Sequence, residues 1–178
     1  AHENGCLVAL EKALVRKAVE KFTAQADRGG LMLFLNMDSR VARIGHIVIP
    51  RLLEHLHVTG LSPSFLCFEL SERFDVTADQ GFQSLVERMR RDGFRFAIDD
   101  FGAGVGEMKL LCDYPVDYVK IDRFFVSGID RSPRRRHLVG ALIAAAHRLG
   151  VKVIAEGVER DEESAVCRDL GADYLQGW

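Results

Sequence analysis

Residues that could do chemistry stand at the ends of short apolar runs along this chain. An acid, an amide or a lysine closes each of six successive runs: Asn36, Glu69, Asp99 with Asp100, Lys120 with Asp122, Glu156, and Gln176. In an α/β barrel the reacting groups lie at the carboxyl ends of the strands. One strand-end carboxylate alone more often caps a helix or accepts a loop hydrogen bond, so the regular recurrence is what indicates a site.

Several carboxylates at one barrel mouth would raise each other's pKa values unless cations neutralise them. Mg²⁺ and Mn²⁺ prefer carboxylate, amide and water oxygens. The adjacent Asp99 and Asp100 suit two ions, because one carboxylate can bridge both while its neighbour binds one. Two ions about 3.5–4 Å apart support the in-line displacement of a phosphoryl group. The residues therefore predict phosphodiester hydrolysis. Lys120 would orient or deprotonate the attacking water or stabilise phosphate charge, and the alternative is an ion pair that only balances the acids.

Strands and helices that alternate along the chain are expected to position these residues. The strands expected are Leu31 to Asn36, Phe65 to Glu69, Phe94 to Asp99, Asp117 to Asp122, Val151 to Glu156 and Asp173 to Gln176. The helices expected are Leu7 to Ala26, Val41 to His57, Gly81 to Arg91, Pro133 to Leu149 and Asp161 to Leu170. Nearly apolar strands separated by helices predict a parallel sheet covered on its faces, an α/β fold. Gly93, Gly150 and Gly171 are expected as left-handed helix C-caps.

Length and composition narrow the class of protein. The 178 residues predict one domain over 1–178, and 48% hydrophobic with 28% charged residues is typical of a globular protein. A formal net charge of −2 gives no positive field to hold a nucleic-acid polymer. The four scattered cysteines argue against a disulfide framework or zinc site, and no apolar stretch approaches the roughly 20 residues of a membrane span. A cytoplasmic location is predicted, although a longer parent protein could be membrane-anchored.

Six short strings resemble, in order, the signatures of the EAL domain family of cyclic di-GMP-specific phosphodiesterases. They are LNMDS with Asn36, ELSE with Glu69 and Glu72, DDFGAG with Asp99 and Asp100, DYVKID with Lys120 and Asp122, EGVE with Glu156 and Glu159, and QGW with Gln176. The resemblance runs from about Ala1 to Trp178.

The resemblance implies a TIM-like (β/α)₈ barrel and a two-metal site for Mg²⁺ or Mn²⁺. Asn36, Glu69 and Asp99 would bind one ion, Asp99 would bridge to a second, and Asp100 and Glu156 would complete it. It further implies that Lys120 positions the hydrolytic water with Asp99, so Lys120, Asp99 and Glu156 are the expected catalytic residues.

Outer positions follow from the same resemblance. Glu72 would steady the loop after the paired aspartates, Gln176 would lie near the second metal, and Asp122 and Glu159 would orient ligands or the lysine. The implied substrate is cyclic di-GMP, opened to linear pGpG. The implied partners are a second copy of the chain and an upstream sensory or GGDEF-type domain.

The chain departs from the family pattern in two places. The Glu-Ala-Leu motif is absent, so two opening strands and one metal-ligating glutamate are expected to be missing from an incomplete barrel, together with the final C-terminal segment. The loop Asp100 to Met108 reads DFGAGVGEM, where the family commonly has DFGTGYSSL, so Val105, Gly106 and Glu107 replace a tyrosine and two serines. In the family this loop orders the metal site and contributes dimer contacts.

Two other functions remain open at this point. The chain could be a catalytically inactive EAL-like receptor or regulatory module, or an unrelated barrel enzyme with strand-end acids. Inactive members usually lose several of the polar positions named above, so the hydrolase is favoured by the presence of Asn36, Glu69, Asp99, Asp100, Lys120 and Glu156. The Phe124 and Phe125 pair is expected to pack in the core, with guanine stacking as the alternative, and the run Arg134 to Arg136 is expected to be solvated at a helix start.

Overall fold

The computed structural model describes residues 2–25, 30–37, 39–70, 80–104 and 106–177, with the side chains of all but residues 2–12, 39–44, 46 and 80. Hydrogen bonding joins six strands in chain order, β1-β2-β3-β4-β5-β6, with helices between them in the sequence. This arrangement confirms the α/β class and the six expected strands. The chain divides into two compact units, Ala1–Phe68 with Val76–Arg95 and Glu69–Asp75 with Phe96–Trp178. The prediction of one domain stays a prediction.

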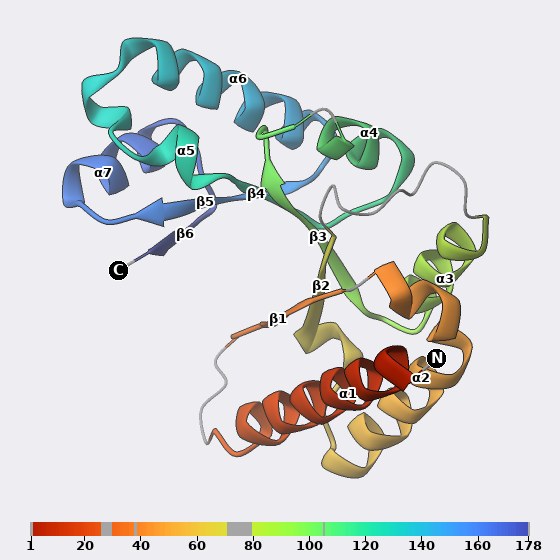
Figure 1. Ribbon diagram of the computed structural model, residues 1–178. Coiled ribbons are helices and arrows are strands. Elements are labelled where there is room, and N and C mark those ends of the chain that lie inside the picture. The colour runs from red at the N-terminus through yellow and green to blue at the C-terminus, as the bar shows by residue number, and fades with distance from the viewer. Residues whose placement is uncertain (1, 26–29, 38, 71–79, 105, 178) are drawn as a thin grey trace. The chain divides into compact units, whose positions relative to one another are not determined.

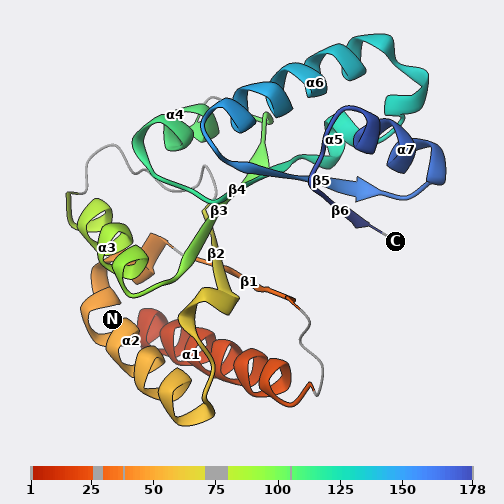
Figure 2. The same cartoon turned by 180° about the vertical axis from the view of Figure 1, so that it is seen from behind.

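The first unit is mainly helical. Its helices and first strands are α1 (His2–Thr23), β1 (Leu33–Asn36), α2 (Ser39–Thr59), the 3₁₀ helix η1 (Pro63–Phe65), the start of β2 (Leu66–Leu70) and α3 (Gln80–Arg91). In Figures 1 and 2, α1 and α2 lie side by side, and α2 also contacts α3. A Cβ atom at Gly45 would lie 2.5 Å from Leu85 Cδ2, so glycine lets α2 and α3 pack this closely without displacing the Leu85 side chain.

The second unit carries most of the expected site. Its elements are the end of β2, then β3 (Arg95–Phe101), α4 (Gly106–Asp113), β4 (Tyr118–Ile121), α5 (Arg123–Val126), η3 (Ile129–Arg131), α6 (Pro133–Arg148), β5 (Lys152–Val158), α7 (Asp161–Asp169) and β6 (Tyr174–Gly177). Figures 1 and 2 show α6 running beside β5, and α5 and α7 contact the same strand. The strand interiors supply the core, in which Phe96, Val119 and Val153 have no exposed surface.

Strands β3 to β6 are parallel, and their register pairs Val119 with Val153, Lys120 with Ile154 and Glu156 with Gln176. The carboxyl ends of parallel strands meet at one edge of a sheet. Residues two apart on a strand share a face, so Ile154 and Glu156 lie on the same side of β5. The register therefore places Lys120 and Glu156 on one face, near that edge.

The expected element ends agree with the observed ones within five residues, and the largest difference is at the start of α1, expected at Leu7 and observed at His2. Gly93, Gly150 and Gly171 have φ values of +100°, +75° and +96°, which confirms the left-handed caps. Helix α6 starts where expected because Ser132 accepts a hydrogen bond from the Arg135 amide and Pro133 occupies the first turn.

Two short helices were not expected from the sequence. Helix α4 has eight residues and α5 has four, too few for an apolar period to appear. Asp122, expected as the last residue of a strand, instead caps α5 by accepting from the Phe124 amide.

Two expectations about side chains were wrong. Phe124 is 66% exposed rather than packed in the core, because α5 begins one residue after β4 and turns this position outward. Its ring contacts Phe125 edge-on and the Arg135 guanidinium. Arg135 and Arg136 are not simply solvated, because they donate hydrogen bonds to backbone carbonyls of the preceding segment, at Ser127, Ile129 and Asp130.

Among the described residues, no helix combines the length and apolar character needed to cross a membrane. The cytoplasmic location stays a prediction.

Candidate functional site

A buried lysine lies among three carboxylates in the second unit. Lys120 Nζ lies 2.6 Å from Glu69 Oε1, 2.9 Å from Asp99 Oδ1 and 2.7 Å from Glu156 Oε1. The four residues come from β2, β3, β4 and β5. The structure thus brings together four side chains that the sequence placed at strand ends.

The local structure explains this convergence. On β4 the side chains of Lys120 and Tyr118 share a face, and the pairing of Lys120 with Ile154 sets Glu156 one pleat nearer the carboxyl end of β5. The pairing of Ile98 with Val119 likewise brings Asp99 level with Lys120. Each of these side chains is therefore held by a strand rather than by a loop.

Two of the charged side chains in this cluster are buried, so their charges are unfavourable unless they are compensated. Lys120 is only 4% exposed and Glu69 only 7%. Burial alone would lower the pKa of Lys120, but hydrogen bonds to Glu156, Glu69 and Asp99 outweigh it and raise that pKa above its ordinary value. The pKa of Glu156 is also raised, because its burial outweighs the attraction of Lys120. The single positive charge of Lys120 therefore does not fully neutralise the negative charges of the surrounding carboxylates.

Asp100 adds a further carboxylate at the same place. Among the described residues it is the one non-glycine with a positive φ, +53°, a conformation that costs an L-residue roughly 1–2 kcal/mol. Burial, followed by the charges of Asp99 and Asp122, raises the pKa of Asp100. The left-handed turn matters for the site because consecutive strand residues would otherwise point to opposite faces.

Asp99, Asp100 and Glu156 form a donor set for a cation. Each offers a carboxylate oxygen, and these oxygens all lie within 4.8 Å of one another. Two oxygens that bind one Mg²⁺ at about 2.1 Å lie at most about 4.2 Å apart, so modest side-chain movement suffices. The residues present therefore fit a hard divalent ion such as Mg²⁺ or Mn²⁺.

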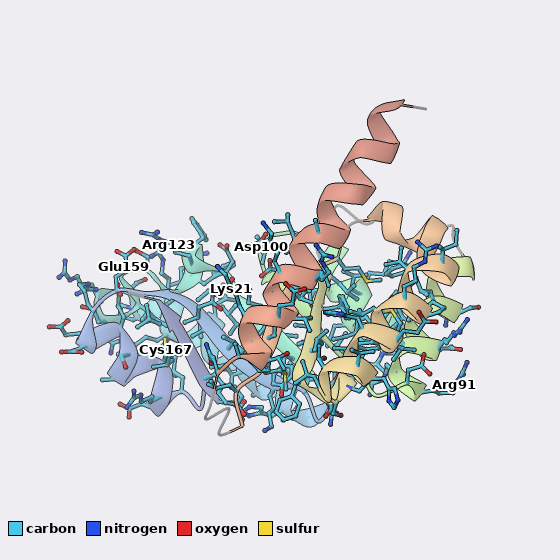
Figure 3. The ribbon with its side chains drawn as sticks, turned by 90° about the horizontal axis from the view of Figure 1, so that it is seen from below. Lys21, Arg91, Asp100, Arg123, Glu159 and Cys167 are labelled. Carbon is cyan, nitrogen blue, oxygen red and sulfur yellow. The ribbon has the colours of Figure 1, made fainter. Side chains whose placement is uncertain are left out.

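Three outer residues predicted from the sequence lie in the same unit as this cluster. Gln176 is the β6 partner of Glu156 in the sheet. Asp122 caps α5 and interacts with Asp100, and Glu159 forms an exposed ion pair with Arg123 at 2.7 Å. Figure 3 shows Asp100, Arg123 and Glu159 along one side of the second unit. Their roles toward ligands stay predictions.

Two other predicted site residues are not among the described members of this cluster. Asn36 is exposed at the end of β1 in the first unit, and its metal-binding role stays a prediction. Glu72 lies outside the described residues.

Sequence reasoning gave no role to two buried acids. Glu107 has no exposed surface, and its Oε2 accepts a hydrogen bond from the Gly104 amide at 2.8 Å. Glu163, 3% exposed, accepts from the amides of Gly128 and Glu159 and from the Arg160 guanidinium. Both stand in the first turn of a helix, where a carboxylate can bind unpaired backbone amides. A glutamate in the first turn of a helix was the sequence signal that could have identified these two residues.

Comparisons with known proteins agree with this geometry. The family model for the EAL domain matches residues 1–178. The chain is 35% identical over 130 residues to the cyclic di-GMP phosphodiesterase RocR of Pseudomonas aeruginosa, covering 73% of this chain and 32% of RocR. The chain therefore spans about a third of that relative.

Two solved structures share the fold. The EAL enzyme Bd1971 in its cAMP and cyclic-di-GMP bound form has a TM-score of 0.87 and 25% identity, covering 97% of this chain and 48% of that one. The manganese/cy-diGMP complex of Klebsiella pneumoniae BlrP1 has a TM-score of 0.77 and 29% identity, covering 84% and 38%. These likenesses confirm the TIM-like fold class of an incomplete EAL-type barrel.

Proposed function

Because this chain belongs to the EAL domain family, we propose that it hydrolyses cyclic di-GMP to linear pGpG with Mg²⁺ or Mn²⁺. The observation that carries the proposal is the convergence of Glu69, Asp99 and Glu156 on Lys120, with Asp100 beside them. RocR is a cyclic di-GMP phosphodiesterase, and BlrP1 forms a complex with manganese and cy-diGMP. These two relatives support the proposed substrate and the proposed class of metal.

The acids would hold the ions. Glu69, Asp99, Asp100 and Glu156, with Asn36, are the proposed ligands, and Asp99 is the proposed bridge. When bound, two such ions supply an activated water and stabilise the leaving oxygen. The protein's contribution is a set of donors fixed on adjacent strands before substrate arrives.

Lys120 would act as a hydrogen-bond donor at the reacting phosphate. Its ammonium is surrounded by carboxylates within 2.9 Å, an environment that keeps it charged and unable to accept a proton. It therefore orients the attacking water beside Asp99 and stabilises negative charge on the phosphate. This favours orientation over deprotonation, which the sequence left as alternatives.

A catalytically inactive cyclic di-GMP receptor is the second candidate. The observation that favours it is the altered loop, in which Gly106 and Glu107 stand where the family has serines. In either function the proposed partners are cyclic di-GMP, a second copy of the chain and an upstream sensory or GGDEF-type domain, and no nucleic-acid polymer.

The two functions differ in turnover. Cyclic di-GMP would be incubated with the full-length protein and Mn²⁺ or Mg²⁺, and pGpG would be quantified by chromatography. We expect metal-dependent pGpG that falls at least about 100-fold in Asp99→Asn and persists in Asp169→Asn, a matched change at an exposed residue of α7. A folded protein that binds cyclic di-GMP but forms no pGpG would contradict the hydrolase and support the receptor.

A further inference from the structure

Glu107 is a fully buried acid next to the candidate metal site in the sequence. It lies in the first turn of α4, has no exposed surface, and accepts a hydrogen bond from the Gly104 amide at 2.8 Å. Burying a carboxylate is unfavourable unless hydrogen bonds compensate it. A buried acid that binds loop backbone is therefore a specific feature of this loop, and the serine expected at this position has a shorter side chain.

The backbone contacts connect Gly104 to Asp100. Ala103 donates its amide to the Asp100 carbonyl at 3.1 Å, which closes a turn that Asp100 opens with a φ of +53°. Gly102 inside this turn has a φ of +100°. The next amide, of Gly104, is the one that Glu107 binds. A continuous set of contacts thus runs from the strained aspartate to the buried glutamate.

The other side of the turn is closed by packing. A Cβ atom at Gly102 would lie 2.9 Å from the Phe125 ring and 3.4 Å from Leu142 Cδ1. The ring of α5 and the side chain of α6 therefore pack directly on the backbone of the turn. With Phe125 on Gly102 and Glu107 on Gly104, the turn is restrained from two directions.

We propose that Glu107 is a positioning residue for metal binding, because its carboxylate anchors Gly104 and so maintains the left-handed conformation that turns Asp100 toward Asp99 and Glu156. A non-glycine residue in this conformation persists only where its surroundings fix it. The inference rests on the proposed metal site and assigns the altered loop a function: Glu107 supplies the order for which the family loop uses other residues.

The test compares Glu107→Met with Glu107→Gln in the full-length protein. Methionine fills a similar volume without an acceptor for the Gly104 amide, whereas glutamine keeps a carbonyl oxygen there. Mn²⁺ binding would be measured from the electron paramagnetic resonance signal of free Mn²⁺. We expect the Mn²⁺ dissociation constant to rise about tenfold in Glu107→Met and to stay within about threefold of the unsubstituted protein in Glu107→Gln.

Hydrogen exchange supplies a second readout that needs no metal. The Gly104 amide should be protected in the unsubstituted protein and should exchange at least about tenfold faster in Glu107→Met. Rapid exchange of this amide in the unsubstituted protein would overturn the anchoring role, even if Glu107→Met did not fold.

Ile129→Ala is the control for a general loss of stability. Ile129 is fully buried in η3 of the same unit and outside the turn. It should lower thermal stability without weakening Mn²⁺ binding. The inference is overturned if Glu107→Met binds Mn²⁺ normally, or if Ile129→Ala weakens binding equally. Failure of the unsubstituted protein to bind Mn²⁺ would instead overturn the metal site on which the inference depends.

Discussion

At the scale of single residues, the protein holds several acids around one buried ammonium. Lys120 is within hydrogen-bond distance of Glu69, Asp99 and Glu156, and Asp100 adds its charge beside them. Such a cluster is stable without a metal only while the lysine is present, because like charges at this distance repel. The same surplus of negative charge attracts a divalent ion.

Replacing Lys120 should therefore change both the stability of the protein and the extent to which Mn²⁺ stabilises it. Lys120→Met leaves one buried and two half-buried carboxylates without a cation and should lower the unfolding free energy of the metal-free protein by about 3–5 kcal/mol. Mn²⁺ should then raise the melting temperature more in the variant than in the unsubstituted protein, because the ion becomes the only neutralising charge. Thermal melts with and without Mn²⁺ measure both effects.

Lys152→Met is the matched control for this change. Lys152 is an exposed lysine on β5 that donates a hydrogen bond to the Tyr174 hydroxyl and lies over the Tyr174 ring. Its loss should alter stability by no more than about 0.5 kcal/mol. Equal melts for Lys120→Met and Lys152→Met would contradict the role assigned to Lys120.

Residue types and strand-end positions were enough to predict much of this cluster. Lys120, Asp99 and Glu156 were predictable because a charged residue that ends an apolar run must lie at a strand end. The burial of Glu107 was not predictable. Nor was the positive φ of Asp100, which belongs to a turn that packs at Gly102 against α5 and α6. Such tertiary contacts leave no period in the sequence.

At the scale of elements, a partly buried ion network joins η3 to α7. Arg160 binds both Asp130 and Glu163, and Glu163 also accepts from the Gly128 amide at 2.7 Å. Because Glu163 accepts from the Glu159 amide as well, the network also holds the segment that follows Glu156 on β5. Its function is to fix short segments that have little regular structure of their own.

Removing the charge of Glu163 should weaken this connection. Glu163→Gln keeps the shape but loses the charge-assisted bonds, so we expect a loss of about 1.5–3 kcal/mol in unfolding free energy. Denaturant unfolding measures it. Asp169→Asn, a change at an exposed position on α7, should cost less than about 0.5 kcal/mol. A similar loss in both variants would contradict the network.

The same residue predicts a dependence on pH. Burial opposes the ionisation of Glu163, but hydrogen bonds from Gly128, Arg160 and Glu159 outweigh it and hold the pKa below its ordinary 4.5. A depressed pKa in the folded state stabilises above the unfolded pKa, and this stabilisation is lost as pH falls through the folded value. The gap between the unsubstituted protein and Glu163→Gln should be constant above about pH 5.5 and narrow below about pH 4.5. A gap that widens on acidification would contradict this assignment.

The exposed position of Phe124 also leads to a prediction. Since Phe124 is 66% exposed, Phe124→Ser should change the unfolding free energy by less than about 1 kcal/mol. Phe96→Ala, at a position with no exposed surface on β3, should cost about 3–5 kcal/mol. Comparable losses in the two variants would show that Phe124 is part of a core. The sequence missed this because α5, a single turn, reorients residues that follow an apolar strand.

At the scale of the whole molecule, the alternation of apolar runs and helical periods was sufficient to predict six strands and their fold class. The structure joins these strands in chain order, and the EAL enzyme Bd1971 has a similar fold. The division of the chain into two compact units was not predictable, since it falls within β2 and at the start of β3, where the sequence shows no linker.

The central claim is that the strand-end acids form a metal site. It is tested most directly by anomalous X-ray scattering from crystals of the full-length protein grown with Mn²⁺, recorded on both sides of the manganese absorption edge. We predict anomalous density in contact with carboxylate oxygens of Asp99, Asp100 and Glu156. Crystals of the same protein that show no anomalous density there at saturating Mn²⁺ would contradict the account.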